Sequence, residues 1–258
     1  MKFKKMHGLG NDFVIFDARK ENIFLTPDDM ALIADRNWGV GCDLITILDE
    51  SDNADIFAYF FNADGSESGA CGNATRCVAD LIMSETGKDE CTVEVTYGIL
   101  NCRKKGDILV EVNMGQAKNV TDLALEHGGV ANPVSVNMGN PHLVFFVDNL
   151  DDISVEELGA YFETHEKFPD RTNVEFVQII DRTHIRQKTW ERGCGVTEAC
   201  GSGACAVAAA AVHRGLTERN VEIELDGGLL NIELQKDDDH ILMTGPVAYV
   251  FDGALNTV

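Results

Sequence analysis

The chain has 258 residues, of which 45% are hydrophobic and 25% are charged, as expected of a soluble globular protein. Its formal net charge of −22 argues against nucleic acid or an anionic membrane surface as a partner, because no basic run balances it. No segment approaches the roughly 18 apolar residues of a membrane span, and Met1–Asp17 lacks the apolar core and cleavage site of a signal peptide. We therefore expect a cytoplasmic protein with no membrane partner.

The first half begins with two predicted strands and a helix. Gly8-Leu9-Gly10-Asn11 separates strands at Phe3–Met6 and Phe13–Asp17. Thr26 then has the features of an N-cap, with Pro27 and Asp29 at the first and third helical positions. The remaining predicted strands are Leu44–Leu48, Ile56–Phe61, Cys91–Val95 and Ile108–Met114. Between the second and third of these, a polar loop at 62–69 leads into a helical pattern that follows Cys71.

The second half repeats this order. Gly139-Asn140-Pro141-His142 separates its first two strands, and a helix starts near Ser154, where Glu157 completes a predicted capping box. A loop at 191–199 precedes a second helix led by Cys200, and Ala204–Val212 is apolar enough to be buried on all sides. The predicted strands of this half are Val134–Met138, Leu143–Val147, Val174–Ile180, Ile185–Trp190, Val221–Leu225, Leu229–Leu234, Ile241–Met243 and Val247–Phe251.

This internal repeat predicts the fold class and the domains. We expect an α/β (α+β) fold of two pseudo-symmetric domains, each a curled, mostly antiparallel sheet around one long helix. The boundary falls near Gly115–Asn119, which gives a domain of residues 1–115 with Cys71 and one of residues 116–258 with Cys200. No low-complexity linker separates them, so we expect a cleft between the packed halves.

The tripeptide Ala-Cys-Gly occurs at the same point of each half, at Ala70-Cys71-Gly72 and Ala199-Cys200-Gly201. Each copy opens a predicted helix. A thiol there is surrounded by unpaired backbone N–H groups and the positive end of the helix dipole, which favours its thiolate. The repeat therefore predicts two matched reactive thiols.

Other uses of cysteine fit the sequence less well. The eight cysteines contain no Cys-x-x-Cys, and their spacings match no common zinc site, so we expect no metal. A disulfide scaffold does not suit a chain of this length. Most of the cysteines, including Cys77 and Cys205 on apolar helix faces, are interpreted as small buried residues.

Two equivalent acid/base groups on opposite sides of a site suit the removal of a proton from one face of a carbon and its return to the other. That chemistry is racemisation or epimerisation. A thiol has an ordinary pKa of about 8.5, so a thiolate and a thiol can coexist near neutral pH. N–H groups at Gly72-Asn73 and Gly201-Ser202 would bind the substrate carboxylate and stabilise the developing charge. No cofactor signature is apparent, so we expect none.

The motifs around the thiols resemble those of the diaminopimelate epimerase family, the cofactor-independent enzymes of bacterial lysine biosynthesis. The resemblance covers the whole chain, in the order Lys5–Phe13, Asn62–Ser66, Cys71–Cys77, Gly139–His142, Arg171–Val174, Glu191–Gly193 and Ala199–Gly203. It implies a homodimer that interconverts LL- and meso-diaminopimelate, a small amino-acid substrate. It also implies that the last strand, near 247–258, packs back on the first half.

The resemblance assigns roles to individual residues of this chain. Cys71 and Cys200 would be the acid/base pair, with His142 and Glu191 beside the thiols and the reacting amine. The residues that would bind the non-reacting end of the substrate are Asn11, Asn62, Asn140, Asn173 and Arg192. Amide oxygens and an arginine suit the ammonium and carboxylate groups of an amino acid.

Three positions depart from the family pattern. Ala74 stands where glycine is usual, Leu44 where glutamine is usual and Val196 where glutamate is common. Leu44 places an apolar side chain in the expected substrate environment. Three alternatives therefore stay open: a racemase of another amino acid, a non-racemising isomerase or lyase on the same scaffold, and a sensor that forms a Cys71–Cys200 disulfide.

Overall fold

A computed structural model describes residues 1–69 and 71–256, so Ala70 of the first Ala-Cys-Gly copy and the last two residues of the expected C-terminal strand lie outside the described part. The chain forms two compact units. Unit 1 contains Met1–Val112 together with Gly245–Val258, and unit 2 contains Asn113–Thr244. The boundary thus precedes the one expected after residue 115, and the C-terminal segment belongs to unit 1.

The main sheet of unit 1 has the strand order β20-β1-β2-β3-β4-β6-β7-β8. The pairs β2–β3 and β4–β6 are parallel and the other pairs are antiparallel. The elements of this unit are β1 (Lys2–Gly8), β2 (Asn11–Asp17), α1 (Pro27–Ala34), β3 (Leu44–Asp49), β4 (Ile56–Asn62), β5 (Glu67–Ser68), α2 (Gly72–Thr86), β6 (Glu90–Val95), β7 (Gly98–Lys104), β8 (Leu109–Gln116) and β20 (Ala248–Ala254).

Unit 2 repeats this arrangement strand for strand, in the order β9-β12-β13-β14-β15-β17-β18-β19. Here β13–β14 and β15–β17 are the parallel pairs, at the same two places in the order. The elements are β9 (Lys118–Asp122), β10 (Glu126–His127), β11 (Val130–Ala131), β12 (Val134–Asn137), β13 (Pro141–Phe146), η1 (Leu150–Asp152), α3 (Val155–Glu163), β14 (Asn173–Ile179), β15 (His184–Glu191), β16 (Gly195–Thr197), α4 (Gly201–His213), β17 (Asn220–Leu225), β18 (Gly228–Leu234) and β19 (His240–Pro246).

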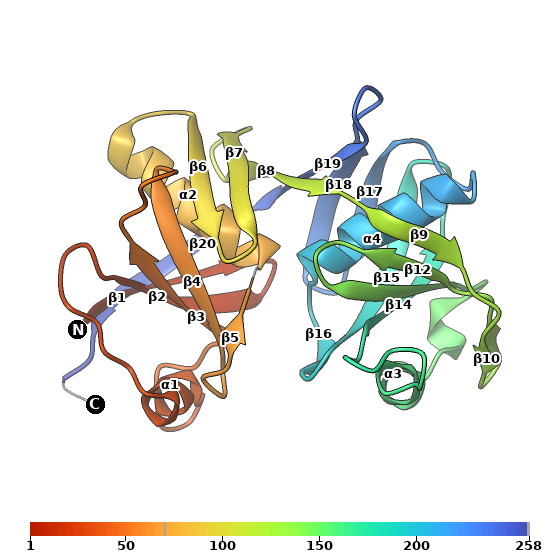
Figure 1. Ribbon diagram of the computed structural model, residues 1–258, viewed down its shortest axis with the longest axis horizontal. Coiled ribbons are helices and arrows are strands. Elements are labelled where there is room, and N and C mark those ends of the chain that lie inside the picture. The colour runs from red at the N-terminus through yellow and green to blue at the C-terminus, as the bar shows by residue number, and fades with distance from the viewer. Residues whose placement is uncertain (70, 257–258) are drawn as a thin grey trace. The chain divides into compact units, whose positions relative to one another are not determined.

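The helices occupy equivalent places in the two units (Figure 1). α1 and α3 each pack on one face of their sheet, whereas α2 and α4 contact strands from several parts of the order and are enclosed by the curl of the sheet. This arrangement confirms the predicted fold class of two repeated, mostly antiparallel sheets around a central helix.

The two short helices illustrate where local sequence rules succeed and fail. Thr26 caps α1, and the reciprocal bonds with Asp29 form the predicted capping box. Ser154 is the N-cap of α3, but its side chain makes no capping bond, so the capping box predicted with Glu157 is wrong. The ψ angle of Ser154 is 91°, against 164° at Thr26.

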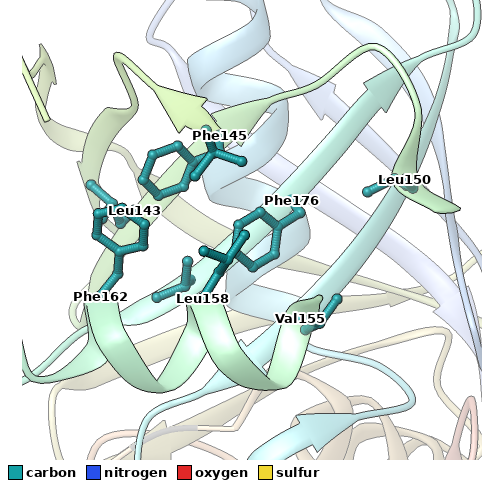
Figure 2. Packing of buried hydrophobic residues seen from close by; sticks show 9 residues of the cluster. Leu143, Phe145, Leu150, Val155, Leu158, Phe162 and Phe176 are labelled. Carbon is teal, nitrogen blue, oxygen red and sulfur yellow. The ribbon is translucent and has the colours of Figure 1, made fainter. Parts of the chain in front are cut away.

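Alternation along the strands separates an apolar face from a face that carries the site. In unit 2, Phe145 and Phe176 pack against Leu158 and Phe162 of α3 (Figure 2). The neighbouring residues on the same strands therefore face the opposite way, toward α4. Val14 and Ile45 of unit 1 pack with α1 in the same manner.

The central helix α4 is built almost entirely of small residues, which lets strands approach it from several directions. Ala204–Ala211 is buried throughout, as predicted, and only Val212 at its end is half-buried. Cys77 in α2 and Cys205 in α4 are fully buried, as the sequence indicates. Within the described residues, no helix combines the length and apolar character needed to cross a membrane.

The α3 cluster of unit 2 gives a direct test of the packing. Phe162 is fully buried, so we expect Phe162→Ala to lower the free energy of unfolding by about 3 to 5 kcal/mol through lost burial and the cavity that remains. Urea unfolding followed by fluorescence of Trp190, which packs against this cluster, measures the change. Phe24→Ala, at an 86% exposed position, serves as the control with an expected change within about 0.5 kcal/mol. Equal effects of the two variants would contradict the burial of Phe162 in this cluster.

Candidate active site

Cys71 is the N-cap residue of α2, and its sulfur accepts a hydrogen bond from Ala74 N at 3.5 Å. The Sγ also lies 3.8 Å from Asn11 Oδ1, at the start of β2. Ala74 occupies a regular, buried helical position and has no positive φ, so the glycine usual in the family is not required by the backbone here.

The amide of Asn11 is oriented by three contacts. Its Oδ1 accepts from Asn73 Nδ2 at 3.2 Å and faces the Cys71 sulfur, and its Nδ2 donates to Asp43 Oδ2 at 2.9 Å. Asp43 in turn is bound by Arg36 and by the main-chain N–H of Asp12. The first predicted site therefore has a supporting layer of charged residues that the sequence analysis did not identify.

Asp12 is the centre of that supporting layer. It pairs with Lys5, which also donates to the Gly41 carbonyl, and with Arg36 at 2.8 Å. Burial acts to raise the pKa of Asp12, but hydrogen bonds and charge from Arg36 and Lys5 outweigh it, and the pKa is lowered from its usual value of 3.8. The carboxylate form is thus part of the folded structure.

Leu44 and Asn62 are direct partners across strands β3 and β4, and Leu44 is also paired with Phe13 on β2. Cross-strand partners point to the same face of a sheet. The structure therefore places Leu44 beside Asn62, on the face that also carries Asn11. The Asn62 amide donates to Ser66 at 2.9 Å in the loop that leads to Cys71.

Cys200 occupies the equivalent place in unit 2, as the N-cap of α4. Its sulfur accepts from Gly203 N at 3.3 Å and lies 3.6 Å from the Ser202 hydroxyl. Unlike Cys71, which is half-buried, Cys200 is only 5% exposed.

A chain of hydrogen bonds leads from Cys200 into the sheet. Asn140 Nδ2 donates to Ser202 Oγ at 3.3 Å, and Asn140 Oδ1 lies 3.0 Å from His142 Nε2. His142 Nδ1 lies 2.7 Å from Glu175 Oε1, and His142 and Glu175 are both fully buried. His142 lies on β13 (Pro141–Phe146), although the sequence predicted it in the loop at 139–142.

Sequence reasoning missed Glu175. The available signal was a single acidic residue inside a mostly apolar predicted strand, between Val174 and Phe176, which both face the core. Its histidine partner lies on another strand, so no local pattern joined the two.

Glu191 and Arg192 follow at the end of β15. The Glu191 carboxylate accepts from Thr197 Oγ1 at 2.6 Å, and burial beside the Glu175 charge raises its pKa despite hydrogen bonds from Thr197 and Cys200. Asn173 accepts from Arg192 N at 3.0 Å and donates to the Pro141 carbonyl at 2.9 Å. The Asn173 side chain thus binds the backbone at both Arg192 and Pro141. The Arg192 side chain is exposed, and its Nη1 donates to the Asp170 carbonyl.

The expectation that a helix start favours the thiolate is wrong for Cys200. Burial raises the pKa of this thiol well above its usual value, and the carboxylates of Glu191 and Glu175 raise it further. Hydrogen bonds from Ser202 and Gly203 act in the other direction but do not overcome these effects. Together these effects favour the protonated thiol of Cys200.

The repeat makes positions in the two half-sites equivalent. Cys71 corresponds to Cys200 and Asn73 to Ser202, each two residues into its helix start. The parallel pairs Phe13–Leu44 and His142–Asn173 are equivalent, so Asn11 corresponds to Asn140. Extending the antiparallel registers makes Asn62 the equivalent of Glu191. One scaffold thus presents two thiols with different neighbours.

The fold is shared with several solved proteins of low sequence identity. A phenazine biosynthesis protein of the PhzF family from Bacillus anthracis superposes with a TM-score of 0.73, at 18% identity, over 100% of this chain and 99% of that one. A hydroxyproline epimerase from Agrobacterium vitis gives a TM-score of 0.72, at 14% identity, over 98% of this chain and 91% of that one. At this identity the likeness defines the fold alone.

Sequence comparison defines the family within that fold. The diaminopimelate epimerase family model matches residues 3–120 and 134–250. A diaminopimelate epimerase from Rhodospirillum centenum is 49% identical to the chain, over 99% of this chain and 92% of that protein. One from Methanococcus maripaludis is 40% identical, over 99% of this chain and 100% of that protein. The chain belongs to the diaminopimelate epimerase family, a family of isomerases.

The Asp12 cluster makes a testable contribution to stability. Because the folded-state pKa of Asp12 is lowered, its contribution is present above the unfolded value of 3.8 and is lost as the pH falls through the folded value. We expect Asp12→Asn to lower the free energy of unfolding by about 2 to 3 kcal/mol at pH 7, with the difference from wild type shrinking below about pH 4. Urea unfolding at several pH values measures it, with exposed Asp237→Asn as control. If the difference in unfolding free energy between Asp12→Asn and wild type is unchanged at pH 3, the lowered pKa of Asp12 is contradicted.

Proposed function

We propose that the protein is a diaminopimelate epimerase that interconverts LL- and meso-2,6-diaminopimelate by proton transfer between two thiols and one α-carbon. The observation that carries the proposal is the repeated helix start, in which Ala74 N and Gly203 N hold the sulfurs of Cys71 and Cys200 in the same geometry. Two fixed thiols of equivalent placement provide a base for one face of the carbon and an acid for the other.

The environment of Cys200 supports an assignment of the two roles in one direction of the reaction. Cys200 holds its proton because burial and two carboxylates raise its pKa, so it serves as the acid. Cys71 as thiolate then removes the α-proton from the opposite face, and in the reverse direction the roles exchange. The leading N–H groups of α2 and α4, at Gly72-Asn73 and Gly201-Ser202, bind the substrate carboxylate and stabilise the carbanion as charge develops.

The polar residues around the thiols recognise the rest of the substrate. His142 and Glu191 lie on the Cys200 side, beside the reacting amine, where they help to set the protonation of the site. The residues that bind the non-reacting end are Asn11, Asn62, Asn140, Asn173 and Arg192. Their amide and guanidinium groups suit a zwitterionic amino acid.

The biological setting proposed for the enzyme is lysine and cell-wall precursor synthesis in the cytoplasm, without a cofactor. A reducing compartment keeps catalytic thiols available, which supports that location. We also propose a homodimer, which the exposed apolar side chains of Tyr249, Val250 and Phe251 on β20 support.

A second candidate is a racemase of another amino acid, and Leu44 is the observation that favours it. The apolar side chain lies next to Asn62, where an amide would bind a polar distal group. Preference for an amino acid with an apolar distal group over diaminopimelate would establish this alternative.

The two-thiol mechanism is tested by single cysteine variants. We expect Cys71→Ala and Cys200→Ala each to lower the kcat of LL to meso conversion by about 10³-fold or more, because each removes one of the two proton-transfer groups. Chiral chromatography of the two isomers measures the rates, and circular dichroism checks folding. Cys194→Ser, at an exposed position, is the matched control and should keep wild-type activity. Turnover that survives in the absence of both site thiols would refute the mechanism.

A further inference from the structure

Glu175 is a buried acid that the proposed mechanism does not use directly. It is fully buried on β14, its Oε1 contacts His142, and its Oε2 has no hydrogen-bond partner among the described residues. Burying a carboxylate is unfavourable unless its partners compensate for the lost hydration. Only one of its two oxygens has such a partner, so packing alone does not explain a glutamate here.

The hydrogen bonds fix where the protons lie. Asn140 donates from Nδ2 to Ser202, so its Oδ1 is the atom that faces His142 Nε2, and Nε2 is therefore a donor. Nδ1 lies 2.7 Å from a carboxylate oxygen of Glu175, so both ring nitrogens of His142 have a polar partner. His142 is thereby locked with one ring nitrogen on the acid and the other on the chain that ends at Cys200.

Glu175 and Cys200 both lie next to Gly203 in the first turn of α4. A Cβ added at Gly203 would lie 2.7 Å from Glu175 Oε1 and 3.2 Å from Cys200 Sγ. The carboxylate and the sulfur thus converge on one small residue, whose N–H binds the sulfur. Any larger residue at 203 would collide with one or both.

The repeat shows that the fold itself does not require this pair. At the positions equivalent to His142 and Glu175, unit 1 carries Phe13 and Thr46, which are also fully buried. The same strands and the same central helix form around a phenylalanine and a threonine. The His142–Glu175 pair is therefore specific to the Cys200 side.

We propose that Glu175 is a positioning residue for the reaction: it locks His142, and through His142 and Asn140 it fixes the Ser202 hydroxyl beside Cys200. This inference rests on the proposed function of Cys200 as an acid/base group. Glu175 itself contacts no substrate in this account. It sets the orientation of the polar groups around the thiol and contributes to the field at the sulfur.

The test measures the reactivity of Cys200 without any substrate. The titratable groups that face Cys200 in unit 2 are Glu191 on β15 and Glu175 on β14, with His142 on β13 in contact with Glu175. Iodoacetamide alkylation of Cys200 is followed by peptide mass spectrometry from pH 6 to 10, in the full chain with Cys194→Ser to remove the exposed thiol. We expect Glu175→Gln to move the profile to lower pH, because it removes a negative charge that raises the pKa of Cys200.

Steady-state kinetics on diaminopimelate give the second measurement. We expect Glu175→Gln to lower kcat about 10- to 100-fold with little change in KM, and Glu175→Asp, which keeps the charge, to retain the wild-type alkylation profile. Thr46→Val, at the equivalent position of unit 1, and Glu111→Gln, a buried carboxylate of unit 1, are the controls and should change neither measurement. If Glu175→Gln does not fold, the double change His142→Phe with Glu175→Thr installs the pair that unit 1 already accommodates.

The outcomes separate this inference from the proposed function. A shifted alkylation profile with lowered kcat supports the positioning role. A lowered kcat with an unchanged profile assigns Glu175 a purely structural part and overturns it, as does wild-type behaviour in both measurements. If the wild-type protein does not convert diaminopimelate, the proposed function fails, and the alkylation profile alone still decides whether Glu175 acts on Cys200.

Discussion

The hydrogen bond from a helix amide to a cysteine sulfur is the interaction on which both half-sites depend. In each unit the bond comes from the third residue of the central helix, Ala74 in one and Gly203 in the other. The sheet of that unit encloses the helix, so the sulfur is fixed relative to β2, which begins at Asn11, or to β13, which Asn140 directly precedes. A thiol at this place needs no loop to position it, because its location follows from where the helix begins.

The repeated scaffold then allows the two thiols to differ. Equivalent positions on equivalent strands hold Phe13 and Thr46 in unit 1 but His142 and Glu175 in unit 2. The polar pair adds charge and a hydrogen-bond chain to one side without changing the strand order or the helix. The proposed two-thiol mechanism needs one protonated and one deprotonated thiol at any time, and unequal surroundings favour the proton on one of them.

The sequence was informative wherever structure and chemistry are local. The capping box at Thr26, both cysteine-led helices and the buried Cys77 and Cys205 follow from neighbouring residues. The short strand β16 was missed, because three residues within a polar loop carry no periodic signal. The capping bond expected at Ser154 is absent although the sequence carries the pattern of a capping box.

The site was predicted residue by residue more completely than its electrostatics. The structure brings Cys200, His142 and Glu191 together as the motifs predict, but the direction of the Cys200 pKa was predicted wrongly. The helix start is a local feature, whereas the burial and the Glu175 charge that outweigh it come from strands distant in sequence. Leu44 shows the same limit, since its position beside Asn62 depends on the pairing of two strands.

Isotope incorporation at the first turnover tests the two-thiol account most directly. A thiol carries a single proton, so the proton delivered to the product comes from a group that has exchanged with solvent, while the substrate proton leaves on the other thiol. With LL-diaminopimelate in heavy water under initial-rate conditions, the account predicts that each meso molecule formed carries deuterium at the inverted carbon and that unreacted LL isomer carries none. Retention of the substrate hydrogen in the product, or deuterium in the unreacted LL isomer at the rate of product formation, would contradict it.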